Sequence, residues 1–347
     1  MDIERNINKP EMEKVIATPY PFVSIYDLDE VVSRVARISP QEQKIIREAF
    51  TAIQKQFTPR KATYYQLSAS AINKTLDEKL EMELARQDKT GVLILDRYIG
   101  REINANGNLF RLELSRAADG SGLTARPGSK IPVNEQVEQL ISWVRGGQFD
   151  ELLIVDDVLA FGDTSVYLIH LLQEGLSGTP GPRLRMLVGL AAFGGGWKGA
   201  ETLKDHTGIG IEYLYKLLAS DKNEWSSGMA VPASRDFTIF GGKILSEEDG
   251  KQKSVPYFLP FQKTVSSFVT LGREQELGKK FLAFNLALVT LLDQKIGRKL
   301  TLGDLDEMGF GIPTSLIPKV RERLSNFPSS FALTDFILEA EQILDSI

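Results

Sequence analysis

Two adjacent carboxylates and a glycine-containing turn are the residues in this sequence that most clearly suggest chemistry. Asp156 and Asp157 directly follow the apolar run 152–155, and Gly162 and Thr164 come next, where a helix is predicted to begin. Backbone N–H groups of such a turn bind anions, and the helix dipole strengthens that attraction. The carboxylates can accept hydrogen bonds from sugar hydroxyls or approach a divalent cation. The spacing therefore suits a phosphorylated sugar.

Segment 152–164 resembles the phosphoribosyl-pyrophosphate (PRPP) motif of type I phosphoribosyltransferases. That motif has four apolar, two acidic, two apolar and two small or hydroxylic residues, then Gly, any residue, and Thr or Ser. The matching positions after the apolar run are Asp156, Asp157, Val158, Leu159, Gly162 and Thr164. Residues 187–203 and 207–213 resemble the strand, glycine turn, helix and returning strand of the orotate-type members. The resemblance covers roughly residues 91–218.

The resemblance implies a mainly parallel, doubly wound α/β fold and the transfer of a 5-phosphoribosyl group from PRPP, with Mg²⁺, to a nucleobase or similar nitrogen nucleophile. Asp156 and Asp157 would be the catalytic carboxylates, which hold the ribose hydroxyls directly or through Mg²⁺. The 5′-phosphate loop would comprise Ala160, Phe161, Gly162, Asp163 and Thr164. The remaining roles are expected at Arg97 and Arg101 for pyrophosphate, Arg126 and Lys130 in a lid, and Trp197 at the base.

Two departures from the motif favour a second hypothesis. Phe161 stands where the family usually has a hydroxylic residue, and residues 96–101 are a poor likeness of a pyrophosphate-binding loop. The alternative is a non-catalytic module of the same fold that senses PRPP or a nucleotide and signals to a partner. Relatives of the family that carry helical additions at their ends, as this sequence is predicted to do, occur in bacterial stress and conflict systems.

Each motif also has an ordinary structural interpretation. The acidic pair can simply cap a turn, and an apolar strand ending in two aspartates also begins response-regulator receiver domains, although there it lies in the first strand. Trp197 can fill the core instead of stacking on a base. Arg235 and the residues after it form either a hood over the base or an ordinary strand and turn. Arg145, followed by two glycines, is better explained by a helix C-cap than by a pyrophosphate loop.

Composition excludes several classes of chemistry. The chain has 347 residues, 42% of them hydrophobic, so at least one buried core is expected. It has no cysteine, which removes disulfides, thiolate nucleophiles and cysteine-held metals. Its two histidines, His170 and His206, are too few for a multi-histidine metal site and are expected to be structural or exposed. A net charge of −5 argues against general nucleic-acid binding.

Three regions are predicted from the apolar patterning. Residues 1–88 are predicted to be helical, with an N-cap at Ser39, Pro40 and Glu42 and a second helix at 68–86. Residues 89–264 are predicted to form the phosphoribosyltransferase-like α/β domain, because apolar runs alternate with helical segments. These comprise strands at 91–95, 109–114, 152–155, 185–192 and 209–214, and helices at 133–144, 164–173 and 199–206.

Residues 265–347 are again predicted to be helical, at 277–292, 301–312 and 333–344. The long segment 116–132 is rich in Gly, Ser and Pro and has no periodicity, so it is predicted to be a loop or lid. The helical flanks are expected to form a hood, a homodimer interface or a surface for a partner protein. We find neither a secretory signal nor an apolar stretch long enough for a membrane span, so a cytoplasmic protein is expected.

Overall fold

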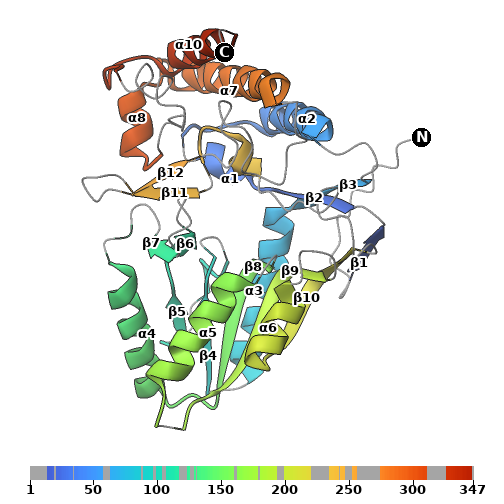
Figure 1. Ribbon diagram of the computed structural model, residues 1–347, viewed down its shortest axis with the longest axis vertical. Coiled ribbons are helices and arrows are strands. Elements are labelled where there is room, and N and C mark those ends of the chain that lie inside the picture. The colour runs from blue at the N-terminus through green and yellow to red at the C-terminus, as the bar shows by residue number, and fades with distance from the viewer. Residues whose placement is uncertain are drawn as a thin grey trace. The chain divides into compact units, whose positions relative to one another are not determined.

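The computed structural model (Figure 1) describes residues 14–18, 21–33, 35–57, 63–86, 89–96, 99–103, 107–116, 123–125, 129, 131–159, 162–178, 180–193, 199–219, 234–241, 243–246, 252–255, 274–310 and 326–345. The chain divides into two compact units. Unit 1 comprises Met1–Val23, Tyr65–Arg116 and Gly122–Val231. Unit 2 comprises Ser24–Tyr64, Ala117–Ser121 and Pro232–Ile347.

Unit 1 is built on a six-stranded sheet in which every neighbouring pair is parallel. From one edge to the other the strands are β1 (Lys14–Thr18), β10 (Gly210–Ala219), β9 (Arg183–Phe193), β8 (Glu151–Leu159), β4 (Thr90–Ile94) and β5 (Leu109–Arg111). Strand β4, which lies next to the edge strand β5, is buried along its whole length, as a strand covered on both faces must be. The prediction of an α/β fold with a mainly parallel sheet is confirmed.

Helices cover both faces of this sheet, as in a doubly wound fold. They are α3 (Ala69–Arg86), α4 (Val133–Gly147), α5 (Asp163–Gly175) and α6 (Gly199–Thr207). One hydrophobic cluster joins α4, α5 and α6 to the sheet. Figure 1 shows α5 and α6 in front of the sheet and α3 behind it. Helix α3 is held there by fully buried Leu76 and Leu80, and burying one such leucine side chain stabilises by about 1.5–3 kcal/mol.

Three small sheets accompany the main one: β2 (Pro21–Tyr26) with β3 (Thr63–Ser68), β6 (Leu114–Arg116) with β7 (Leu123–Ala125), and β11 (Lys243–Ser246) with β12 (Gln252–Val255). The single strand predicted at 109–114 is therefore two strands, β5 and β6. The predicted loop 116–132 includes β7, which pairs antiparallel with β6. These short strands lack the apolar runs that reveal the central ones.

Unit 2 is mainly helical. Its elements are α1 (Leu28–Val32), α2 (Pro40–Phe57), the 3₁₀ helix η1 (Ser234–Phe237), α7 (Glu274–Ile296), α8 (Leu302–Glu307) and α10 (Leu333–Asp345). Fully buried Phe50 of α2 lies 5.8 Å, ring centre to ring centre, from Phe284 of α7. The predicted cap of α2 is confirmed, because Ser39 Oγ accepts from Glu42 N and donates to Glu42 Oε2. The hydrogen bond from Lys295, and then those from Ser39, lower the pKa of Glu42 to about 2.

The two units differ from the three regions predicted from the sequence. The helices expected in separate regions 1–88 and 265–347 share one core in unit 2, because α2, α7 and α10 bury their apolar faces together. Helix α3 and strand β1, both within 1–88, belong instead to unit 1. None of the helices among the described residues is long and apolar enough to cross a membrane.

Candidate functional site

The predicted acidic pair lies at the topological switch point of the sheet. From β4 the chain adds β5 on one side and then, through α4, β8 on the other side of β4. Ile94, the last residue of β4, is in register with Val155, so residues 156–159 of β8 extend past the end of β4. In open parallel sheets, ligands bind outside the carboxyl ends of the strands at such a point.

The prediction that Asp156 and Asp157 come after the strand is wrong, because both residues lie inside β8. The strand continues to Leu159 because the long neighbour β9 pairs with it there: Asp156 is in register with Val188 and Leu159 with Ala191. Both aspartates are half-buried. Successive side chains of a strand point to opposite faces, so Asp156 lies on the α4–α6 face and Asp157 on the α3 face. Asp156 Oδ1 accepts a 3.0 Å hydrogen bond from Asp157 N.

Gly162 begins the helix that follows β8, as predicted. It has φ +87° and is the N-cap residue of α5, with no side chain capping that helix end. A Cβ atom at this position would lie 2.7 Å from the carbonyl oxygen of Gly199, the first residue of α6. The N-termini of α5 and α6 are therefore close together. Each helix directs the positive end of its dipole to this edge of the sheet, and each has an acidic residue in its first turn, Asp163 in α5 and Glu201 in α6.

The remaining predicted site residues divide into two groups. Asp163 is exposed and Thr164 is half-buried in the first turn of α5, next to Gly162. Arg101 is exposed in the loop after β4. The others lie outside the described residues: Ala160, Phe161, Arg97, Arg126, Lys130 and Trp197.

Side chains hold the backbone of the loop after β4. Asp96 Oδ1 accepts from Ile99 N at 3.2 Å, and Asp77 Oδ1, from α3, accepts from Gly100 N at 2.5 Å. Arg111, at the end of β5, donates to the carbonyl oxygens of Ile99, at 2.7 Å, and of Gly100. The described residues of this loop, 95, 96 and 99–103, are called the β4 loop below.

The electrostatics of the β4 loop follow from burial. Burial raises the pKa of Asp77, although the hydrogen bond from Gly100 opposes this change. Burial, and then the charge of Arg101, lower the pKa of Arg111. No role was predicted for Asp77 or Arg111. One signal was an arginine within the alternating strand pattern at 109–114, because a half-buried guanidinium needs acceptors.

Gln136 of α4 fixes both sides of the predicted lid. Its side-chain amide nitrogen donates to the carbonyl oxygen of Ile131 at 2.8 Å and to Ser129 Oγ at 3.3 Å. Its oxygen accepts from Glu113 N at 2.9 Å. Gln136 is buried, so these bonds are protected from competing water. They tie the residues next to β6 to the residues just before α4.

The described residues contain no group of three or more acidic or histidine side chains placed to hold a metal ion. Magnesium is commonly held by one or two carboxylates together with substrate phosphates and waters. Asp156 offers a carboxylate of this kind, on the same face of the sheet as the start of α6. The predicted contact of Asp156 with a substrate-borne Mg²⁺ stays a prediction.

Several other candidates have ordinary structural roles. Arg235 lies in the 3₁₀ helix η1, where a strand was predicted. Its Nε is 3.2 Å from Oδ2 of the buried Asp27. Arg145 donates to the carbonyl oxygen of Gly175 at 2.5 Å, near the end of α4. The left-handed residue after that helix is Gln148, where a glycine was expected. His206 contacts the carbonyl oxygen of Thr202, and His170 is exposed.

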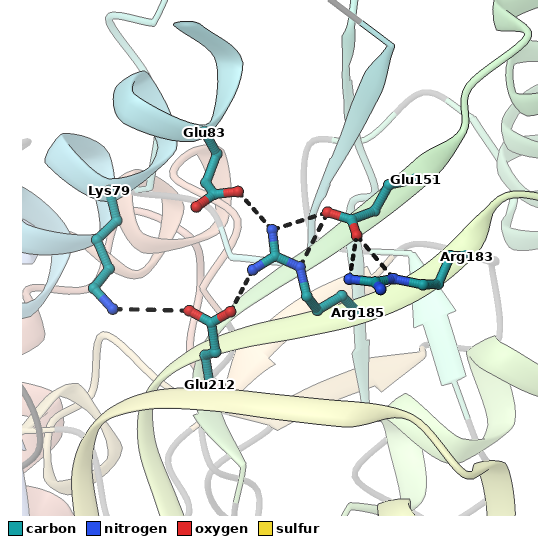
Figure 2. A network of polar contacts seen from close by, with 6 residues as sticks. All are labelled: Lys79, Glu83, Glu151, Arg183, Arg185 and Glu212. Atoms are coloured by element: carbon teal, nitrogen blue, oxygen red, sulfur yellow. Dashed lines mark hydrogen bonds and ion pairs between the residues drawn. The ribbon is translucent and has the colours of Figure 1, made fainter. Parts of the chain in front are cut away.

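The opposite, amino edge of the sheet carries the charged network of Figure 2. Arg185 of β9 contacts three carboxylates: Glu83 of α3 and Glu151 of β8 at 2.5 and 2.9 Å, and Glu212 of β10. Hydrogen bonds to these groups raise the pKa of Arg185, although burial, the largest single influence, acts to lower it. Arg183 pairs with Glu151, and Lys79 with Glu212. These six residues are called the amino-edge network.

Comparison with protein-family models and with curated protein sequences finds no match for this chain. The features available are the switch point, the acidic pair, and the two helix N-termini at Gly162 and Gly199.

Proposed function

We propose that unit 1 is phosphoribosyltransferase-like and binds a 5-phosphoribosyl ligand at the carboxyl edge of its sheet. The observation that carries the proposal is the position of Gly162, which places the start of α5 against the start of α6 beside the switch point. The first-turn N–H groups of α5 would bind the 5′-phosphate, and Thr164 would add a hydroxyl donor. Asp156 would accept hydrogen bonds from the ribose hydroxyls.

The reaction proposed is transfer of the phosphoribosyl group from PRPP. A bond forms between a nitrogen of the acceptor and the anomeric carbon, and the bond from that carbon to the pyrophosphate oxygen breaks. Pyrophosphate leaves with the electron pair, and the acceptor nitrogen loses its proton. Mg²⁺ would supply charge neutralisation of the leaving group. The protein would orient the sugar and exclude water.

A second candidate function is binding without catalysis, in which the site senses PRPP or a nucleotide. One observation favours it. In the β4 loop, where the pyrophosphate is expected, the N–H groups of Ile99 and Gly100 are already bonded to the carboxylates of Asp96 and Asp77. A loop that cradles pyrophosphate offers such groups to the ligand. In a sensor, unit 2 would be the part that binds a partner protein or a second copy of the chain.

Calorimetric titration of the full chain tests the shared part of both proposals. We expect ribose 5-phosphate to bind, and Gly162→Ala to weaken it at least about tenfold, because a Cβ atom there strains the backbone and meets Gly199. Gly178→Ala is the matched control, since Gly178 also has positive φ, at the far end of α5, but open space around it. If neither ribose 5-phosphate nor PRPP binds at millimolar concentration, both proposals are contradicted.

Pyrophosphate release distinguishes the enzyme from the sensor. The full chain is incubated with PRPP, Mg²⁺ and a panel of nucleobases, and released pyrophosphate is measured. The enzyme predicts turnover that the double variant Asp156→Asn, Asp157→Asn abolishes. Tight PRPP binding without release of pyrophosphate for any base would support the sensor.

A further inference from the structure

A half-buried lysine near the acidic pair has aromatic neighbours in place of acidic ones. Lys216 Nζ, on β10, lies 4.6 Å from the ring centre of Phe193 and 6.0 Å from that of Tyr213. The two rings pack edge to face with their centres 5.3 Å apart. Within the described part of the chain Lys216 forms no ion pair. This contrasts with Lys79 of the amino-edge network, which pairs with Glu212.

The strand register places this group near Asp156. Tyr213 is in register with Val188, which is in register with Asp156. Lys216 is likewise in register with Ala191, and Ala191 with Leu159, the last residue of β8. Residues in one row of a parallel sheet point to the same face. Leu159 and Ala191 belong to the cluster of α4, α5 and α6, so the row of Lys216 faces the same side as the row of Asp156. Two strand spacings are about 10 Å.

Phe193 and Tyr213 pack against the cluster that includes α5 and α6. The aromatic pair and Lys216 are therefore at the carboxyl edge, on the same face as Asp156 and the start of α6. A lysine side chain is long enough to reach a ligand bound between these strands.

The chemistry of the proposed function places the acceptor on this side of β8. In a displacement at the anomeric carbon, the nucleophile approaches from the side opposite the leaving group. Pyrophosphate is expected at the β4 loop and the ribose at β8, so the acceptor belongs toward β9 and β10. This step rests on the proposed function.

We propose that Phe193, Tyr213 and Lys216 form the acceptor subsite, and that the acceptor is a planar molecule with a negatively charged group. Aromatic side chains offer apolar surface to a planar ring. An ammonium held over a ring is partly desolvated, so it contributes more to the binding free energy of an anion than a fully hydrated lysine does. No carboxylate of the described protein competes for this ammonium.

The test compares ligand pairs that differ in charge and little in shape. Nicotinate against nicotinamide, and benzoate against benzamide, are titrated into the full chain without PRPP. We expect wild-type protein to bind each carboxylate about tenfold or more tightly than its amide, as charge-assisted hydrogen bonds do. Lys216→Met should abolish the preference and Lys216→Arg should retain it.

Lys204→Gln is the matched control. Lys204 is an exposed lysine on α6 that forms no ion pair among the described residues, so its replacement should leave the preference unchanged. If Lys216→Met does not fold, Lys216→Gln replaces it, with circular dichroism to confirm the fold.

Three outcomes would overturn the subsite. The first is that wild-type protein shows no preference for the carboxylates, and the second is that Lys216→Met leaves the preference unchanged. The third is that Lys216→Met weakens the binding of inorganic pyrophosphate and not that of the carboxylates. Ribose 5-phosphate, titrated in parallel, reports on the proposed function separately. Binding of ribose 5-phosphate without any carboxylate preference overturns the subsite alone. A Lys216-dependent carboxylate preference without ribose 5-phosphate binding overturns the proposed function and supports the subsite.

Discussion

The two edges of the sheet in unit 1 use carboxylates in different ways. At the amino edge, Glu83, Glu151 and Glu212 all contact the guanidinium of Arg185. At the carboxyl edge, the carboxylates of Asp77, Asp96 and Asp156 accept from backbone N–H groups. Side-chain ion pairs join separate strands and a helix, so they stabilise the sheet. Carboxylates that accept from backbone N–H groups hold the backbone conformation of the β4 loop and of the end of β8. We expect this to affect the local conformation more than the stability.

The largest expected effect is at the amino edge. Arg185→Met should lower the free energy of unfolding of unit 1 by about 3 kcal/mol, because Glu83, Glu151 and Glu212 lose the guanidinium that they share, and buried Glu151 then has only the mostly exposed Arg183 as an ion-pair partner among the described residues. Urea unfolding followed by circular dichroism measures the change. Arg183→Gln is the control. Because 74% of the Arg183 side chain is exposed, it should cost at most about 1 kcal/mol. Equal losses in the two variants would contradict the network's role.

At the carboxyl edge, Gly162→Ala should have an intermediate effect on stability and a large one on binding. Strain at φ +87° and the contact with Gly199 should cost about 1–3 kcal/mol. Because Arg185 lies at the opposite edge, the variant Arg185→Met should bind ribose 5-phosphate as the wild type does, under conditions in which the variant is folded. If both variants lost stability and binding in proportion, the two edges would not differ in function.

The smallest effect is expected at Asp77. Burial raises its pKa, so the ionised carboxylate costs stability at neutral pH, and Asp77→Asn should stabilise unit 1 by a few tenths of a kcal/mol at pH 7. The gain should shrink as the pH falls through the raised pKa, because the wild-type carboxyl is then protonated as well. Unfolding at pH 7 and pH 4 measures this. A gain that grows at low pH would show that Asp77 is stabilising in its ionised form.

The fold was predictable where a local signal is strong. The apolar runs predicted the cores of β4, β8 and β9, and Ser39, Pro40 and Glu42 predicted the start of α2, because caps depend on residues close in sequence. The extension of β8 through Asp156 and Asp157 was missed. That segment is a strand only because β9 supplies hydrogen-bond partners, which no local pattern in β8 reports.

The candidate site was predictable in part for the same reason. The glycine turn before α5 has a local signature, and Gly162 lies where it was predicted. Arg111 and Asp77 meet the β4 loop from β5 and α3, so their roles depend on tertiary contacts. Lys216 was missed because a lysine among apolar residues on a strand does not indicate which rings it will meet.

The shared core of α2 and α7 has a consequence for synthesis of the chain. Phe50 of α2 packs against Phe284 of α7, more than two hundred residues later in the sequence. At translation rates of about 5–20 residues per second, Phe284 is synthesised roughly 12–47 s after Phe50. Unit 1 has most of its strands in that interval and can fold while α2 remains uncovered. A chaperone that binds the emerging chain would therefore be expected to act on α2.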